Sequence, residues 1–284
     1  MTLDFLPKIP DSPSLGEQAP RRLDDRRAQV DHLVRFSRAH RAVRHPFLIT
    51  LATGGFGGRT RAVARRFAHA YHGFSSRFPE YLEAVLSRLE RPSHRARLSE
   101  NLAEERGRLD PEVAATLRDL GIAIEDVDGV PHPVLFERYC DAVGATTDLR
   151  AHPPVATRSW SNAFLLALRD HTAAFGVGAL GIATESIVAP TYAQILAGLA
   201  GIEDLDRRDL VFFELHCHVD DRHQEDLLQI ARDLAEEPGG AEALERGARV
   251  SLSLRAAFWD ALYASCLDRT QRAREPSPQE LLHA

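Results

Sequence analysis

The sequence predicts an all-α protein with one helical domain. Apolar residues recur at helical spacing from about residue 23 to residue 272, and prolines or glycines mark most of the boundaries between these stretches. No run of alternating apolar and polar residues is long enough to predict a strand. The chain has 284 residues, of which 44% are hydrophobic and 27% charged, a balance typical of a soluble globular protein with a sizeable core.

The two ends of the chain differ from this helical region. Residues 1–22 are rich in proline and predict an extended or flexible arm, and residues 273–284 predict a polar tail. The start of the chain has acidic residues and prolines where a signal peptide would have a basic and then an apolar stretch. Three widely spaced cysteines (Cys140, Cys217 and Cys266) predict no disulfide framework, so we expect a cytoplasmic protein.

The first half of the domain predicts shorter helices. Val30, Leu33 and Phe36 share one side of a helix over 23–40, and the glycines of 54–58 predict a turn. Pro79 favours the first turn of a helix, Ser93 a helix cap and Gly107 a helix end. The expected helices lie at 60–78, 79–92 and 93–107, with a short one at 111–120 inside an insertion spanning 108–131.

Longer helices are expected in the second half. A helix over 132–144 is followed by a connection at Pro153 and Pro154. The remaining helices are expected at about 159–173, 174–200, 206–235 and 240–270.

Polar residues interrupt an apolar seam in the segment 209–237. The stripe at spacings of four and three residues runs through Phe212, His216, Asp220, His223 and Leu227. Burial of a carboxylate and two imidazoles is costly unless they are paired or bind a metal, and a helix brings these positions close together. Imidazole and carboxylate ligands suit iron, manganese or zinc. The alternatives are a hydrogen-bonded core cluster and a rotated, solvated seam.

A single carboxylate occurs in the apolar segment from Ala174 to Ile202. Glu185 is the only charged residue there, and five glycines and Pro190 favour a buried core helix over a membrane span. Glu185 therefore requires a partner. It could bind a metal, stay protonated, or pair with an arginine such as Arg158.

Two further ligand-type residues come from other helices. Glu105 continues the stripe of Leu98 and Leu102, whereas its neighbour Glu104 faces elsewhere. His132 stands between two prolines at the start of its helix, where a histidine is commonly a cap or a surface residue.

Four stretches together resemble the haem-oxygenase-like di-iron oxidases and oxygenases. They are NLAEERG (101–107), HPVLFERYCDAVG (132–144), GIATESIVAPTYAQILAGL (181–199) and FFELHCHVDDRHQEDL (212–227). The resemblance covers about residues 78–234 and is most specific in the spacing of His216, Asp220 and His223. One departure is the separation of Glu105 from His132 by 26 residues, where the family has a short link.

The resemblance implies a fold and a metal site. The fold is a single seven-helix haem-oxygenase-like (TenA/PqqC-like) bundle over 23–272, without haem. Two Fe(II) ions would react with O2 through a peroxo-di-iron(III) intermediate, with electrons from an external donor. The family pattern selects Glu105 over Glu104. The implied metal ligands, which are also the catalytic residues, are Glu105, His132, Glu185, His216, Asp220 and His223.

The resemblance also limits the reaction. Relatives oxygenate an amine nitrogen or cleave a C–C bond in an amino or fatty acid. We favour N-oxygenation of a small amine or amino-acid-derived substrate in natural-product biosynthesis. An amino-acid substrate calls for an arginine to bind its carboxylate, and the 35 basic residues, all arginine except Lys8, offer too many candidates.

Other classes of function remain open. A thiaminase-like enzyme would need a core cysteine with a carboxylate partner, which neither Cys140 nor Cys217 shows, and a metal store or an interaction module would give no O2-dependent product. The net charge of −6 disfavours nucleic acid and anionic membranes as partners. The expected partners are a small-molecule substrate and a reductant, with a homodimer left open.

Overall fold

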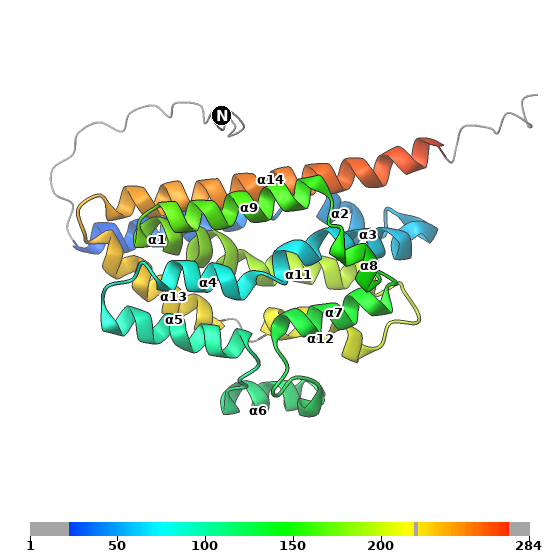
Figure 1. Ribbon diagram of the computed structural model, residues 1–284, viewed down its shortest axis with the longest axis horizontal. Helices are drawn as coiled ribbons and strands as arrows, with labels where there is room; N and C mark the ends of the chain where they lie inside the picture. The colour runs from blue at the N-terminus through cyan, green and yellow to red at the C-terminus, as the bar shows by residue number, and fades with distance from the viewer. Residues whose placement is uncertain (1–22, 219–220, 273–284) are drawn as a thin grey trace, which may run out of the picture.

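The computed structural model describes residues 23–218 and 221–272, which form helices running mainly along the long axis of the molecule (Figure 1). No strand occurs among these residues, so the predicted all-α class is confirmed. The α-helices of the first half are α1 (Leu23–Ala39), α2 (Pro46–Ala52), α3 (Thr60–Ser75), α4 (Phe78–Leu86), α5 (Pro92–Glu105) and α6 (Pro111–Asp119). Those of the second half are α7 (His132–Ala142), α8 (Thr147–Ala151), α9 (Val155–Asp170), α10 (Ala173–Val177), α11 (Ser186–Leu199), α12 (Arg207–His218), α13 (Asp221–Ala235) and α14 (Gly240–Arg272).

The apolar segment Ala173–Leu199 forms the centre of the bundle. It consists of α10, the π-helical segment η3 (Gly178–Glu185) and α11. Helix α14 packs along α10 and η3, while α2 and α12 pack against α11 and α13 packs against η3. The segment is long and apolar enough to span a membrane, but 83% of its most apolar part is buried inside the bundle. Burial in the core accounts for its composition, as the sequence predicted.

Glycines allow the central segment and α14 to touch through their backbones. A Cβ at Gly178 would lie 2.1 Å from the carbonyl oxygen of Leu244, and one at Gly247 would lie 2.0 Å from that of Phe175. No side chain fits in either place. The two glycines therefore fix how closely α14 approaches the segment that carries Glu185.

The helical hydrogen-bond pattern changes in the middle of the central segment. In η3 the turns widen, and the hydroxyl of Thr184 donates to the carbonyl of Ala179, five residues earlier, at 2.9 Å. Pro190 has no N–H for the carbonyl of Ser186, and this carbonyl instead accepts a hydrogen bond from Arg38 Nε at 3.1 Å. Wide turns of this kind are frequent at functional sites.

Several sequence-based expectations need correction. The described residues form more helical segments than the seven expected, because η3 divides the central helix and short helices such as α8 connect longer ones. Ser93 is not a cap: α5 begins at Pro92 and its N-cap residue is Arg91, in extended conformation. The helix expected over 206–235 is described as α12 and α13, with residues 219–220 outside the described residues. The arm 1–22 and the tail 273–284 lie outside them as well.

The insertion 108–131 forms a small unit at one side of the bundle. It contains α6 and a 3-10 turn, η2 (Ile124–Asp126), and α6 projects from the lower edge of the molecule in Figure 1. Leu117, Ile122 and Val127 form its buried apolar contacts. The predicted short helix is confirmed, with α6 ending one residue earlier than expected.

Candidate metal centre

Glu105 is the last residue of α5, and the turn that follows it is set by Gly107. Gly107 has a φ of +100°, and a Cβ there would lie 2.8 Å from the backbone of Val130. The Gly107 carbonyl accepts a hydrogen bond from the N–H of Gly129 at 2.9 Å. The chain thus leaves for the insertion and returns at the same point, beside the end of α5.

His132 begins α7 at this point of return. Pro131 precedes the helix in extended conformation and Pro133 occupies the first turn, which fixes the direction of α7. His132 is buried, and its Nδ1 lies 3.0 Å from Oε1 of Glu105. The closed neck of the insertion therefore brings together two residues that have 26 others between them in the sequence. His132 is buried rather than at the surface, where a histidine in this position is commonly found.

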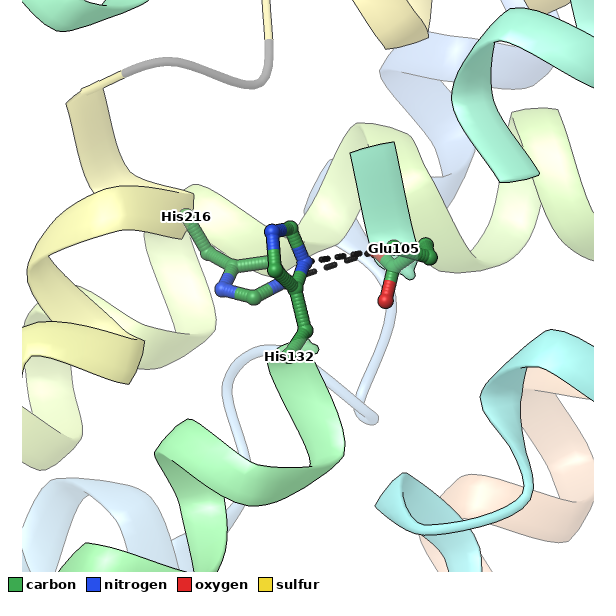
Figure 2. Close-up of side chains that lie close together, drawn as sticks. All are labelled: Glu105, His132 and His216. Carbon is green, nitrogen blue, oxygen red and sulfur yellow. Dashed lines mark ion pairs between the residues drawn. The ribbon is translucent and has the colours of Figure 1, made fainter. Parts of the chain in front are cut away.

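His216 reaches Glu105 from α12, with its ring beside that of His132 (Figure 2). Its Nδ1 lies 2.6 Å from the carbonyl oxygen of Phe212, which can only accept, so Nδ1 carries the proton and donates. Nε2 is then the nitrogen that would bind a metal, and it lies 3.8 Å from Oε1 of Glu105. A hydrogen bond of this kind on the remote nitrogen is typical of histidines that bind metals.

The three side chains fit a metal ion. One ligand atom from each of Glu105, His132 and His216 lies within 4.8 Å of the others, and all three residues are buried. His132 Nδ1 has no hydrogen-bond partner among the described residues, although a carboxylate oxygen lies 3.0 Å away. Neighbouring ligands about 2.1 Å from one ion are themselves about 3 Å apart, so this spacing suits a shared ion. Two imidazoles and one carboxylate are a common ligand set of non-haem iron.

The charge state of Glu105 suits the same role. Burial by itself would raise the pKa of this carboxyl, but the imidazoles of His132 and His216 outweigh burial and hold the pKa well below its ordinary value. Glu105 is therefore ionised at neutral pH, and a buried carboxylate between two imidazoles is a strong cation ligand.

A small cavity of about 20 Å³ adjoins the three residues. This is room for one or two water-sized groups. Glu185 lines the same cavity from the end of η3, so a fourth predicted residue faces the cluster. The rest of the wall consists of hydroxyl, aromatic and apolar side chains, namely Tyr71, Phe74, Ser75, Phe78, Thr184, Val188, Tyr192 and Phe212.

The remaining predicted residues have different outcomes. Asp220 lies outside the described residues, as does the side chain of His223 in α13. Arg158, one alternative partner for Glu185, is exposed and donates to the carbonyl of Pro153 at 2.6 Å. Glu104 is buried and lies 3.7 Å from Arg108, away from the three-residue cluster. The structure thus brings Glu105, His132 and His216 together beside Glu185, and their role as ligands stays a prediction.

Sequence reasoning missed the tyrosines of the cavity wall. The hydroxyls of Tyr71 and Tyr192 lie 3.0 Å apart, and the ring of Tyr192 packs edge-on at 5.6 Å from that of His216. Tyrosines at helical spacing are common core residues, so no pattern distinguished them. The two hydroxyls add polar atoms to the aromatic part of the wall.

The sequence profile of a family described as iron-containing redox enzymes matches residues 65–256, more than half of the chain. The chain belongs to this family. The matched range contains all six predicted ligands, so the family and the geometry point to the same part of the molecule. A search of curated protein sequences gave no match.

Solved structures show the same fold as this family member at low sequence identity. A CADD-like protein of unknown function from Nostoc punctiforme aligns with a TM-score of 0.66 and 19% identity, covering 86% of this chain and 99% of its own. A TenA homologue from Pseudomonas syringae aligns with a TM-score of 0.63 and 13% identity, covering 84% of this chain and 92% of its own. A domain of unknown function with a haem-oxygenase-like fold from Shewanella denitrificans aligns with a TM-score of 0.59 and 14% identity, covering 89% of this chain and 94% of its own. The predicted haem-oxygenase-like fold is confirmed.

Proposed function

We propose that this protein is a non-haem iron oxygenase or oxidase that uses O2 to oxidise a small amine or amino-acid-derived substrate, with N-oxygenation as the favoured reaction. The observation that carries the proposal is the buried cluster of Glu105, His132 and His216 beside Glu185, in a member of an iron-containing redox family. Oxidative C–C cleavage by the same site is the alternative reaction. Natural-product biosynthesis in the cytoplasm is the proposed setting.

Glu105, His132 and His216 would hold one iron ion. We assign a second ion to Glu185 together with Asp220 and His223, following the resemblance of the sequence. Bound iron would supply O2 binding and the electrons that reduce O2, and an external donor would restore those electrons. The six side chains together have three carboxylates and three imidazoles, a ligand set that suits two such ions.

The protein's own contribution is orientation and the exclusion of water. The Phe212 carbonyl holds His216 in one tautomer, and the neck at Gly107 holds Glu105 against His132. Phe74 and Phe212 are both buried and line the cavity, so they help to exclude water from it. A small cavity lined by polar as well as apolar groups suits a substrate with a compact polar reacting group.

The test is an anaerobic Fe(II) titration of the full chain, followed by a pulse of O2 and monitored by visible absorption. We expect about two irons per chain and a transient absorption band after the pulse. Tight binding of fewer than two ions would contradict the two-ion assignment. Iron binding without O2 consumption in the presence of any amine or amino acid would indicate a metal store.

Matched glutamate variants test which residue binds. Glu105→Gln should lower iron affinity at least 10- to 100-fold, because a charged ligand becomes a neutral amide. Glu104→Gln is the control, since Glu104 is also buried but faces Arg108. Equal iron affinity in the two variants would contradict the choice of Glu105 over Glu104 as a ligand. An unchanged number of irons bound per chain in His223→Ala would contradict the assignment of His223 as a ligand.

A further inference from the structure

One arginine of α14 lies in the core, and no carboxylate of the described residues pairs with it. Arg255 is 1% exposed, and its Nη1 donates to the hydroxyl of Tyr71 at 3.2 Å. Its Nε and Nη2 have no hydrogen-bond partner among the described residues, and no described carboxylate forms an ion pair with it. Within the part of the chain that the structure describes, the N–H groups on Nε and Nη2 of this guanidinium therefore have no acceptor.

Such an arrangement is costly for the folded protein. A guanidinium stays protonated even when buried, and an uncompensated buried charge carries a large desolvation penalty. The rings of Phe74 and Trp160 lie 5.3 and 5.4 Å from the guanidinium carbon and offset part of this penalty. Aromatic faces stabilise a cation but leave its N–H groups free, so the site can still accept an anion.

Arg255 lies directly behind the wall of the cavity at the metal centre. Tyr71, which accepts its hydrogen bond, lines the cavity, and so does Phe74, whose ring faces the guanidinium. The Tyr71 hydroxyl also contacts that of Tyr192 at 3.0 Å, and Tyr192 packs beside His216. A pair of tyrosines thus links the buried guanidinium to the cluster of Glu105, His132 and His216.

We propose that Arg255, with the Tyr71 hydroxyl, binds the carboxylate of the substrate and directs the other end of the molecule toward the metal centre. The substrate class is then a small carboxylic acid, such as an amino acid, rather than a simple amine. The planar fork of N–H donors on a guanidinium matches the two oxygens of a carboxylate. Because the cavity measures about 20 Å³, Phe74 has to turn aside to admit the ligand. This inference rests on the proposed function.

The test measures anion binding to the metal-free full chain by intrinsic fluorescence. Trp160, one of two tryptophans, stacks on Phe74 at 3.9 Å and faces Arg255, so it reports ligand at this position. The probes are propionate and isobutyrate, with propionamide as the neutral counterpart and inorganic phosphate as an anion of another shape. We expect saturable changes with the carboxylates and at least 10-fold weaker binding of propionamide and phosphate.

Variants assign the binding to Arg255. Arg255→Gln should raise the Kd for propionate about 10- to 100-fold, the effect of losing a hydrogen-bonded charge. Arg249→Gln is the control, because Arg249 lies on the same helix but forms an exposed pair with Glu245. Tyr71→Phe should raise the Kd several-fold, and it tests the site should Arg255→Gln fail to fold.

Stability separates a ligand site from a structural arginine. If Arg255 is kept for a ligand, metal-free Arg255→Gln should melt at the same temperature as the wild type or higher, since a penalised charge is removed. A lower melting temperature together with unchanged propionate binding would overturn the proposal, as would phosphate binding as tight as that of propionate.

Iron binding keeps the two proposals apart. Arg255→Gln should bind iron as the wild type does, because Arg255 is not among the predicted ligands. Iron binding without carboxylate binding would overturn only the inference about Arg255. Carboxylate binding in a chain that takes up no iron would overturn the proposed function and leave a carboxylate-binding protein.

Discussion

Gly107 is the single residue on which the meeting of Glu105 and His132 depends most directly. Its φ of +100° is open only to glycine without strain, and the backbone of Val130 lies where a Cβ would be. The turn at Gly107 therefore determines both the direction in which α5 ends and the place to which the chain returns.

Gly107→Ala should separate Glu105 from His132 and lower iron affinity by 10-fold or more, because the added methyl group has to displace the backbone of Gly129 and Val130. Gly54→Ala is the matched control, since Gly54 also has a positive φ, of 70°, but nothing lies within 4 Å of its Cβ position. The measurement is Fe(II) titration of both variants. Equal affinities would show that the neck does not position the site.

Polar residues in apolar seams were the most informative sequence signal at this scale. The seam argument selected Glu105 and His216, which the structure brings together. The same argument applied to α14 would have found Arg255, since Leu252, Trp259 and Leu262 continue its stripe and are buried. The proximity of His132 could not be predicted from spacing, because it depends on how a 26-residue excursion closes.

The contact of α14 with the central helix is the element-scale feature that places Glu185. Gly178 and Gly247 let the two backbones touch, and this contact holds η3 in position along α14. The sequence predicted a buried helix with one carboxylate but not the wide turns of η3, because a π-helical pattern leaves no periodic signal over so short a stretch. The sequence predicts that Pro190 leaves the Ser186 carbonyl without its helical hydrogen bond, but it does not predict that Arg38 donates to this carbonyl instead.

Gly178→Ala should destabilise the fold by about 1–3 kcal/mol, the range for overpacked cores, because its Cβ would meet the Leu244 carbonyl oxygen at 2.1 Å. Gly201→Ala, where nothing lies within 4 Å of the added carbon, should change stability by less than about 1 kcal/mol. Urea unfolding monitored by circular dichroism compares them. Equal midpoints would mean that the two helices can separate at no cost.

At the scale of the whole molecule, His45 connects the N-terminal part of the bundle to its last helix. Its Nδ1 accepts a hydrogen bond from the N–H of Phe47 and caps α2, so Nε2 carries the proton and donates to Asp260 of α14 at 3.1 Å. The bond that Nδ1 accepts requires the neutral ring, whereas the bond from Nε2 to Asp260 persists when the ring is protonated. Burial lowers the pKa of His45 by more than the bond to Asp260 raises it, and burial also lowers the pKa of His40 and His72.

Stability should therefore fall as the pH drops below 6.5, the ordinary pKa of histidine. There the unfolded chain binds protons that the folded chain excludes, so each such histidine removes up to about 1.4 kcal/mol per pH unit. His45→Asn keeps a capping side chain but cannot titrate, and its loss of stability between pH 7.5 and 5.5 should be smaller than that of the wild type. Urea midpoints at the two pH values measure this.

The exposed His32 provides the control for this pH effect. His32→Asn should show the same loss of stability between the two pH values as the wild type, because this side chain is solvated in the folded protein. A loss in His45→Asn as large as that in His32→Asn would mean that protonation of His45 does not oppose folding.

The closed neck at Gly107 also separates the length of the insertion from the geometry of the bundle. The N–H of Gly129 bonds the Gly107 carbonyl and closes the insertion at its base, so a change of length within residues 108–128 need not move the ends of α5 and α7. Foreign sequence, or new chain ends in a circular permutant, should be tolerated at the exposed Gly121 turn, with the ends of α5 and α7 left in register. A fluorescent reporter inserted there would sit on the side of the bundle where Glu105 and His132 meet, without becoming part of it.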